Sequence, residues 1–213
     1  MTAQANLESR QARLEHQWPT PPTARELDAQ FPGIFDGAML LAGGANIILQ
    51  LALPGVGYGV AESRVESGSI LHHPIKRSRT TFTYLAVAMM GTSEEKLAYR
   101  RAVNRSHAQV HSTEDSPVKY NAFDENLQMW VAACLYWGFV DTHQKLHGPM
   151  TRQEQETFYQ LAHPLGTTLQ VRQDTWPKDL EAFEEYWQDG LQKLPLVIKG
   201  DVHGSVEAVN SAL

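Results

Sequence analysis

The sequence has a single cysteine and no excess of positive charge. Cys134 is alone among 213 residues, so the chain cannot form an internal disulfide, and nothing in it requires an oxidising compartment. The formal net charge is −6, whereas nucleic-acid-binding proteins gather basic residues on one face. We therefore expect no nucleic-acid partner.

Common signatures of nucleotide and hydrolase sites are also missing. The sequence contains no P-loop, no GxGxxG turn and no GxSxG elbow, and it has no low-complexity tract or repeat. It begins MTAQANLESRQARLEHQW, which is polar and charged and is not typical of a secretory signal. We expect a cytoplasmic protein.

Charged residues are absent between Asp36 and Glu62. The stretch GAMLLAGGANIILQLALPGVGYGVA is long enough to span a bilayer. Its glycines and Pro54 divide it into a helix over 36–52 and a second short element, and no basic cluster flanks it to set an orientation. The pattern favours a buried helix pair over a membrane span.

Helical periodicity dominates the rest of the chain. Thr92 with Glu95, and Thr151 with Glu154, form the capping boxes that open expected helices. Pro177 is expected in the first turn of the last helix. The expected helices cover residues 36–52, 55–64, 77–91, 93–113, 124–147, 152–163 and 177–193. The sequence therefore predicts an all-α fold.

The two ends of the chain differ from this helical body. Residues 1–25 end in TPPTAR and are interpreted as an arm or linker, because Pro21 and Pro22 cannot enter a helix interior. Residues 26–193 form the predicted helical domain. Residues 194–213, LPLVIKGDVHGSVEAVNSAL, have the pattern of a strand, a turn and a short helix, and are interpreted as an appended β/α segment.

Histidines at HxxxH spacing suggest one kind of site. His107 with His111, and His143 with His147, are four residues apart, and such pairs share a helix face and could bind a metal ion. Neither pair contains the glutamate of an HExxH zinc protease. A helical protein that binds a non-haem metal is therefore one hypothesis. Cys134 lies on an apolar stripe and is interpreted as a core residue rather than a nucleophile.

A cationic helix start suggests a different site. The stretch KRSRTTFTYLAVAMM, residues 76–90, places Arg77, Arg79 and three threonines directly before a long apolar run. Haem requires a cation for its propionates, a broad apolar slot for its macrocycle and an axial histidine for its iron. The same pattern also suits a basic amphipathic surface. Both interpretations stay open on these residues alone.

Five stretches in series resemble the family of haem-dependent oxygenases that includes latex clearing protein (rubber oxygenase) and the mycophenolic-acid-pathway oxygenase. The matching stretches are GGANIILQLALPGVGYGVAES (43–63), RSRTTFTYLAVAMMGT (77–92), VNRSHAQVHS (103–112), YNAFDENLQMWVAACL (120–135) and LGTTLQVRQDTWPKDLEAFEEYW (165–187). The final segment 194–213 resembles a fragment of bacterial translation initiation factor 2, and we assign it no activity.

The resemblance implies an all-α, partly globin-like bundle that binds haem b non-covalently. It implies activation of dioxygen and oxidative cleavage of a carbon–carbon double bond in an apolar, isoprenoid-like substrate. His107 would be the axial metal ligand, and Arg77, Arg79 and Thr81 would contact the cofactor. Glu62 would act as a base, so the catalytic residues are Glu62, Arg77 and Thr81.

Three positions depart from the family pattern. His111 stands where the family usually has arginine, and it could compete with His107 as a ligand. Ala132 and Leu53 stand where the family often has histidine. A binding module that holds haem or an apolar ligand without catalysis is therefore a further hypothesis.

Overall fold

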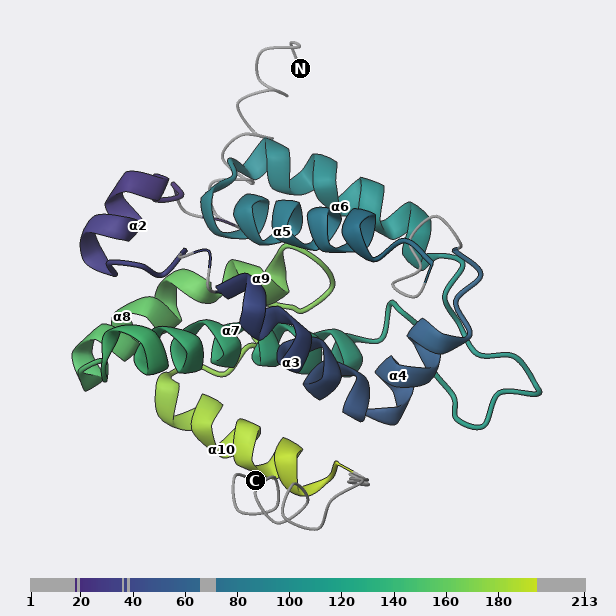
Figure 1. Cartoon of the computed structure of the whole chain (residues 1–213). Coiled ribbons are helices and arrows are strands. Elements are labelled where there is room, and N and C mark those ends of the chain that lie inside the picture. Colours follow the sequence, from purple (N-terminus) through teal and green to yellow (C-terminus); the bar gives the residue numbers. More distant parts are fainter. Residues whose placement is uncertain (1–17, 19, 36, 38, 66–71, 195–213) are drawn as a thin grey trace.

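A computed structural model describes residues 18, 20–35, 37, 39–65 and 72–194 (Figure 1). Within these ranges the protein is helical, with loops and one isolated antiparallel bridge between His111 and Asn121. The all-α prediction is confirmed. The helices are α2 (Ala24–Gln30), α3 (Met39–Ala52), α4 (Pro54–Ala61), α5 (Pro74–Met90), α6 (Ser93–His107), α7 (Glu125–His147), α8 (Arg152–Ala162), α9 (Pro164–Thr167) and α10 (Leu180–Gln192).

Side-chain caps explain where several helices begin. The predicted capping boxes at Thr92 with Glu95 and at Thr151 with Glu154 are both present. Each threonine hydroxyl accepts a hydrogen bond from the backbone N–H three residues on, while the glutamate accepts one from the threonine N–H. Asp124 caps α7 by accepting hydrogen bonds from two backbone N–H groups of its first turn.

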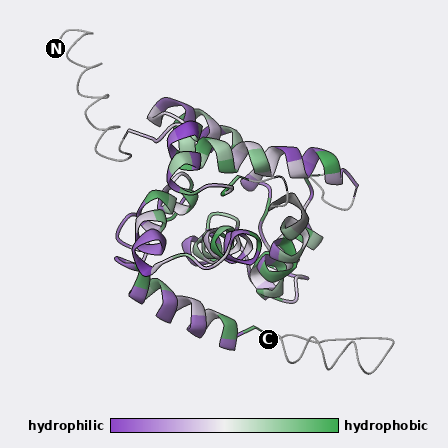
Figure 2. Cartoon of the chain, turned by 60° about the vertical axis from the view of Figure 1, so that its left-hand side comes forward, coloured by the Kyte–Doolittle hydropathy of each residue, from purple (hydrophilic) through white to green (hydrophobic). Residues whose placement is uncertain are grey.

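Helix α7 forms the centre of the bundle, with α3, α8 and α9 packed around it and with Trp187 of α10 stacked on its Trp130 and Trp137 (Figure 1). Figure 2 shows purple and green alternating along the outer helices, as expected for helices that bury one apolar face. Cys134 is fully buried on α7, and burial raises the pKa of its thiol. This environment matches the predicted core role, because a buried thiol stays protonated and unreactive.

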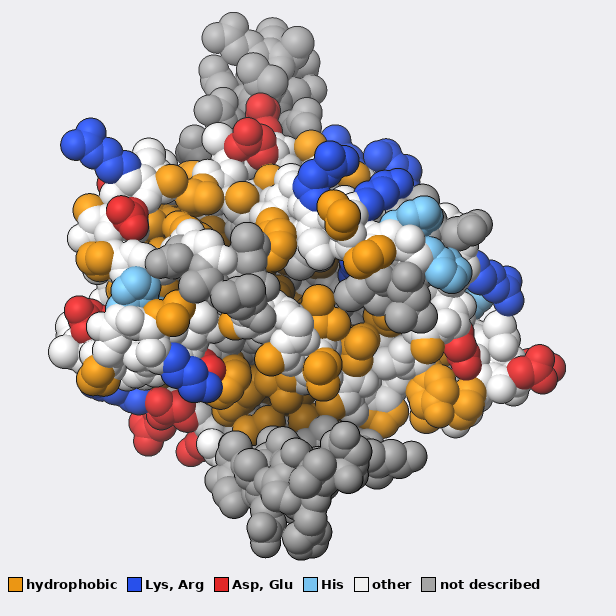
Figure 3. Space-filling view, viewed as in Figure 1, with side chains coloured by type: hydrophobic (Ala, Val, Ile, Leu, Met, Phe, Trp, Pro, Cys, Tyr) orange, Lys and Arg blue, Asp and Glu red, His pale blue; other side chains and the backbone are white. Residues whose placement is uncertain are grey.

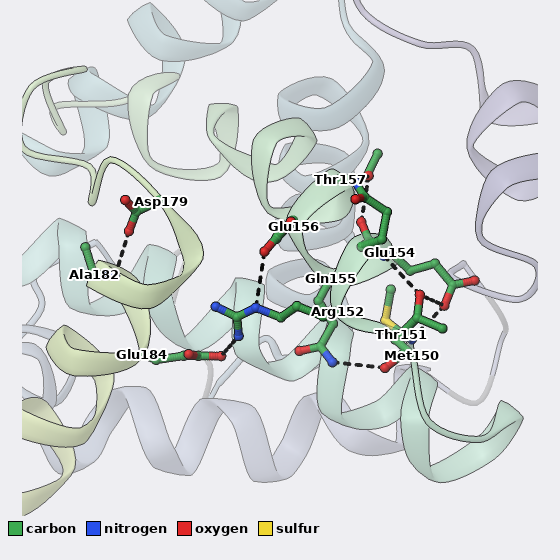
Figure 4. Close-up of polar contacts among 11 residues, drawn as sticks. Met150, Thr151, Arg152, Glu154, Gln155, Glu156, Thr157, Asp179, Ala182 and Glu184 are labelled. Atoms are coloured by element: carbon green, nitrogen blue, oxygen red, sulfur yellow. Dashed lines mark hydrogen bonds and ion pairs between the residues drawn. The ribbon is translucent and has the colours of Figure 1, made fainter.

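Helices α8 and α10 are connected by an exposed ion-pair network (Figure 4). The Arg152 guanidinium lies 3.3 Å from Glu156 on its own helix and 2.5 Å from Glu184 on α10. Exposed pairs of this kind contribute little stability each, so the apolar contacts beneath them hold the two helices together.

The apolar stretch over α3 and α4 is bent and only partly buried. Asn46 Nδ2 donates a hydrogen bond of 2.6 Å to the carbonyl of Cys134, which fixes one face of α3 on α7. On α3, Ile48 is 72% exposed, so the pair is not enclosed as the sequence pattern suggested. No single described helix is long and apolar enough to cross a membrane; Ala42–Ala52 and Pro54–Ala61 reach that length and composition only together, across a bend of 107°.

Several helix boundaries differ from the sequence prediction: α4 ends at Ala61 instead of 64, and α5 begins at Pro74 instead of 77. Helix α6 ends at His107 instead of 113, because the chain turns there and His111 pairs with Asn121. The last helix begins at Leu180, where Asp179 accepts a hydrogen bond from the N–H of Ala182. Pro177 therefore lies before that helix and not in its first turn.

The segment predicted as an arm contributes a core residue. Trp18 is 1% exposed, and its Nε1 donates a hydrogen bond of 3.3 Å to Thr167 Oγ1. The predicted domain boundaries at 25 and 193 stay predictions. The appended segment lies outside the described residues, except for Leu194.

Candidate functional site

The first turns of α5 separate its cations onto different faces. A helix turns about 100° per residue, so Arg79 lies about 200° around α5 from Arg77. Arg77 and Tyr84 lie beside Tyr99 of α6, and Tyr84 OH donates a hydrogen bond to the carbonyl of Leu165. Thr81 shares their side of α5, while Ile75, Arg79 and Phe82 share the opposite side. The two arginines of the basic stretch therefore differ: Arg77 lies on the inner side of α5 and Arg79 on the outer side.

The threonine hydroxyls of this stretch bond to the helix itself. Thr80 and Thr81 donate hydrogen bonds of 2.8 and 3.0 Å to the carbonyl of Arg77, and Thr83 donates one of 2.9 Å to the carbonyl of Arg79. Such hydrogen bonds to a preceding turn leave the hydroxyl oxygen free only as an acceptor. Thr81 is half-buried and so stays beside Arg77 on the inner face.

His107, the last residue of α6, has an unsatisfied buried nitrogen. Its Nδ1 is buried and has no hydrogen-bond partner among the described residues. Burial lowers the pKa of His107 to about 4, with a further contribution from the positive charge of Arg77. The imidazole is therefore neutral at pH 7. A buried polar atom without a partner costs free energy, which a ligand at that atom would recover.

Arg77 is a cation without an anionic partner among the residues that the structure describes. The residue as a whole is exposed, but the protein around its guanidinium lowers its pKa by burial, while nearby Tyr99 acts in the opposite direction. No carboxylate of the described residues lies within ion-pair distance of it. Tyr99 holds the helix pair together by donating a hydrogen bond of 2.7 Å to the carbonyl of Thr80. A partly desolvated, unpaired guanidinium favours an anionic ligand.

The sequence analysis missed the residues that position His107. Phe123 contacts the imidazole edge-on, with ring centroids 6.3 Å apart. Gln128 Nε2 donates hydrogen bonds to the carbonyl of Ala122 at 2.5 Å and to Gln170 Oε1 at 2.8 Å. Gln170 Nε2 in turn donates one of 3.0 Å to Asn104 Oδ1, one turn before His107. No sequence pattern identifies this amide network, because its members come from distant parts of the chain.

Replacing Gln128 with leucine is expected to raise the pKa of His107 from about 4 toward its ordinary value of 6.5. Without the amide, the hydrogen bonds to Gln170 and to the Ala122 carbonyl are lost. We expect the neighbouring Phe123 to move and water to reach the His107 imidazole. We also expect the unfolding free energy to fall by about 2 kcal/mol, because the Ala122 carbonyl and Gln170 Oε1 lose their hydrogen-bond donor. The pKa is measured by NMR titration of the ring protons, with Gln153→Leu, at an exposed position of α8, as the control. An unchanged pKa in folded Gln128→Leu would show that the network does not control this site.

Glu62 lies in a separate, polar pocket of about 260 Å³. Its Oε2 accepts hydrogen bonds from Ser116 Oγ at 2.6 Å and from Tyr120 OH at 2.8 Å, and these hydrogen bonds, Ser116 first, lower the pKa of the carboxyl group. The pocket is lined by Glu62, Arg64, Gln109, Val110, His111, Thr113, Asp115, Ser116 and Tyr120. The structure thus places Glu62 with His111 in one pocket, and places Arg77 close enough to His107 to lower its pKa.

The histidine pairs do not form comparable sites. His107 and His111 do not share a helix, because α6 ends between them. His143 and His147 do share α7, with ring centroids 5.1 Å apart, but His143 Nε2 lies 3.1 Å from the carbonyl of Pro32. Among the described residues, no group of three or more His, Cys, Asp or Glu side chains is arranged to hold a metal ion.

These features define an all-α protein in which a neutral histidine on α6 lies near an arginine of α5 that no described carboxylate pairs with. A family model described as the catalytic domain of ER-bound oxygenase mpaB/B' and rubber oxygenase matches residues 34–206. The chain belongs to this oxygenase family. The match extends into the segment that the sequence pattern separated at residue 194.

Two curated relatives share more than half of their aligned residues with this chain. They are uncharacterized protein Mb2261 of Mycobacterium bovis and uncharacterized protein Rv2237 of Mycobacterium tuberculosis, each 56% identical over 156 residues. The alignment covers 72% of this chain and 61% of each relative, so the chain spans about three-fifths of the length of these relatives. No solved structure matches the chain.

Proposed function

We propose that the protein is a haem b-dependent oxygenase that uses dioxygen to oxidise an apolar, isoprenoid-like substrate, including cleavage of its carbon–carbon double bond. The observation that supports this most directly is the pairing of His107 and Arg77. His107 offers a neutral imidazole with a buried, unpartnered nitrogen, and Arg77 offers a cation with no carboxylate partner in the described chain. Both lie in a domain that belongs to an oxygenase family.

His107 and Arg77 fit two of the chemical needs of a haem, an imidazole for the iron and a cation for the carboxylates. His107 would hold the haem iron through its neutral imidazole, because its low pKa keeps a nitrogen lone pair available throughout the physiological pH range. The haem carboxylates require a cation in a partly desolvated place, which Arg77 supplies. Leu85, Ala88 and Met89 continue the inner side of α5 as apolar residues, and Ala88 and Met89 are packed in the core.

Haem, when bound, supplies an iron centre that reacts with dioxygen. The chain's own residues would bind the cofactor, orient the substrate and exclude water from the site. Arg77 would balance the negative charge of the haem carboxylates. Thr81 donates its hydroxyl proton to the Arg77 carbonyl, so its oxygen can act only as a hydrogen-bond acceptor. For Glu62 we propose the role of base, with Oε2 as the atom that receives a proton. Because this oxygen already accepts two hydrogen bonds, Glu62 is a weak base unless Ser116 or Tyr120 turns away.

Oxygen uptake tests this proposal. The haem-loaded protein is mixed with a short isoprenoid alkene in oxygenated buffer, and products are identified by mass spectrometry. We expect oxygen consumption that depends on the alkene and carbonyl products derived from it. A haem-loaded protein that consumes no oxygen with any such alkene would support a non-catalytic binding module instead.

A further inference from the structure

The loop between α6 and α7 has one buried side chain. This loop, residues 108–124, begins directly after His107 and ends at the residue that caps α7. Tyr120 is 8% exposed, and every other residue of the loop is half-buried or exposed. Figure 1 shows the loop beside α4, and Figure 3, in the same view, shows acidic side chains at this outer edge of the molecule. The loop therefore has no apolar core of its own, and its position depends on what holds Tyr120.

The two arms of this loop are paired with each other. The Ser112 N–H donates a hydrogen bond of 2.9 Å to the carbonyl of Tyr120, and the Ala122 N–H donates one of 2.9 Å to the carbonyl of Val110. Amide protons in such hydrogen bonds exchange with water when the segment opens. The amides of Ser112 and Ala122 therefore report on how firmly the loop is held.

Helix α4 holds Tyr120 by a hydrogen bond and by packing. Glu62, at the C-terminal end of α4, accepts hydrogen bonds at Oε2 from Tyr120 OH at 2.8 Å and from Ser116 Oγ at 2.6 Å. The Tyr120 ring lies on Gly59, where an added methyl group would be 3.4 Å from Cδ2 of the ring. Glu62 thus connects α4 to two points of the loop, one of them its buried side chain. We call Glu62, Ser116 and Tyr120 the clasp.

The loop held by the clasp ends beside His107. Phe123 contacts the His107 imidazole edge-on, with ring centroids 6.3 Å apart, and it follows Tyr120 by three residues. Phe123 is 38% exposed, so its own packing holds it only in part. Gln128 Nε2 donates a hydrogen bond of 2.5 Å to the carbonyl of Ala122, which fixes the base of the loop. The place of Phe123 against His107 therefore depends on the clasp as well as on Gln128.

We propose that Glu62 is a positioning residue, which acts through the clasp to hold the 108–124 loop on α4 and to keep Phe123 against the His107 imidazole. Oε2 is the acceptor in both hydrogen bonds of the clasp, and the negative charge of the carboxylate strengthens them. Tyr120 and Ser116 thereby act on the site through Phe123 and not by contact with His107. This role requires neither haem nor dioxygen, so it stands independently of the function proposed above.

Hydrogen exchange and NMR spectra of the full chain without cofactor test the proposal. Tyr120→Phe keeps the ring on Gly59 and removes the hydroxyl. We expect the amides of Ser112 and Ala122 to exchange about five- to tenfold faster, because a hydrogen bond that holds the loop is lost. We also expect the ring-proton signals of His107 to shift at constant pH, since Phe123 moves and its ring current at the imidazole changes.

Two variants of Glu62 distinguish the carboxylate from its partners. Glu62→Ala loses both hydrogen bonds of the clasp, so we expect exchange at Ser112 and Ala122 to be at least as fast as in Tyr120→Phe. Glu62→Gln keeps an acceptor oxygen, so we expect it to retain part of the protection from exchange and to shift the His107 signals less.

Tyr58→Phe is the matched control. Tyr58 is 37% exposed on α4 and takes no part in the clasp, so this variant is expected to change neither the exchange nor the His107 signals. Unchanged exchange in Tyr120→Phe and Glu62→Ala, or an equal acceleration for the amides of α8, would overturn the proposal. Faster exchange with unchanged His107 signals would overturn it too, because the clasp would then hold the loop without positioning Phe123. Because no haem is added, none of these outcomes depends on the oxygenase proposal.

Discussion

Haem affinity is expected to fall about ten- to a hundredfold when Arg77 is replaced by glutamine. The guanidinium lies on the inner face of α5, burial lowers its pKa, and no described carboxylate pairs with it. A hydrogen bond to a charged group contributes about 1.5–3 kcal/mol, which corresponds to this range of affinity. Titration of purified protein with haem, followed by absorbance, measures the change.

Arg79→Gln is the matched control for Arg77→Gln. Both residues are exposed arginines near the start of α5, but Arg79 faces away from His107. We expect Arg79→Gln to change haem affinity by less than about twofold, within the range for exposed charges. If both variants lose haem affinity equally, Arg79 contacts the cofactor as the family resemblance implies. The difference between the two faces of α5 would then not explain haem binding.

Acid is expected to destabilise the protein through His107 by about 2 kcal/mol between pH 8 and pH 5. The pKa of His107 is lowered from 6.5 to about 4 in the folded protein, mainly by burial. Between these two values the unfolded chain binds a proton that the folded chain does not, so the unfolding free energy falls as pH falls. The contribution is fully present above pH 6.5 and is lost as pH falls toward 4.

Urea denaturation across this pH range measures the effect. The control is His107→Gln, which keeps a polar side chain of similar size but does not titrate. We expect its unfolding free energy to depend less on pH than that of the parent chain, by the amount given above. Parallel profiles for the two proteins would show that His107 titrates at its ordinary pKa and is not buried.

Local sequence signals predicted the helices well where the chain carries its own start signal. Each helix start depends on four consecutive residues, Thr92 to Glu95 and Thr151 to Glu154, because a capping box satisfies backbone donors with nearby side chains. The end of α6 was missed. Residues after His107 have helical composition, but the chain turns there to pair His111 with Asn121, a contact that depends on a distant segment.

The candidate site was predictable only in part for the same reason. The resemblance placed Arg77, Thr81 and His107 in one site, and the structure brings Arg77 close enough to lower the pKa of His107. It could not show that Glu62 bonds to Ser116 and Tyr120, which lie more than fifty residues further along. The amide network around Gln128 was likewise invisible, because hydrogen bonds between distant side chains leave no periodic pattern.

The absorption spectrum of the protein purified with haem supplied tests the central claim most directly, beside His107→Ala and His111→Ala. We expect a Soret band in the parent chain and in His111→Ala, because His111 lies outside α6 in the pocket of Glu62. In His107→Ala the band is expected to be lost or shifted, since the neutral imidazole next to Arg77 is gone. A Soret band that is unchanged in His107→Ala, or absent from all three proteins, would contradict the account.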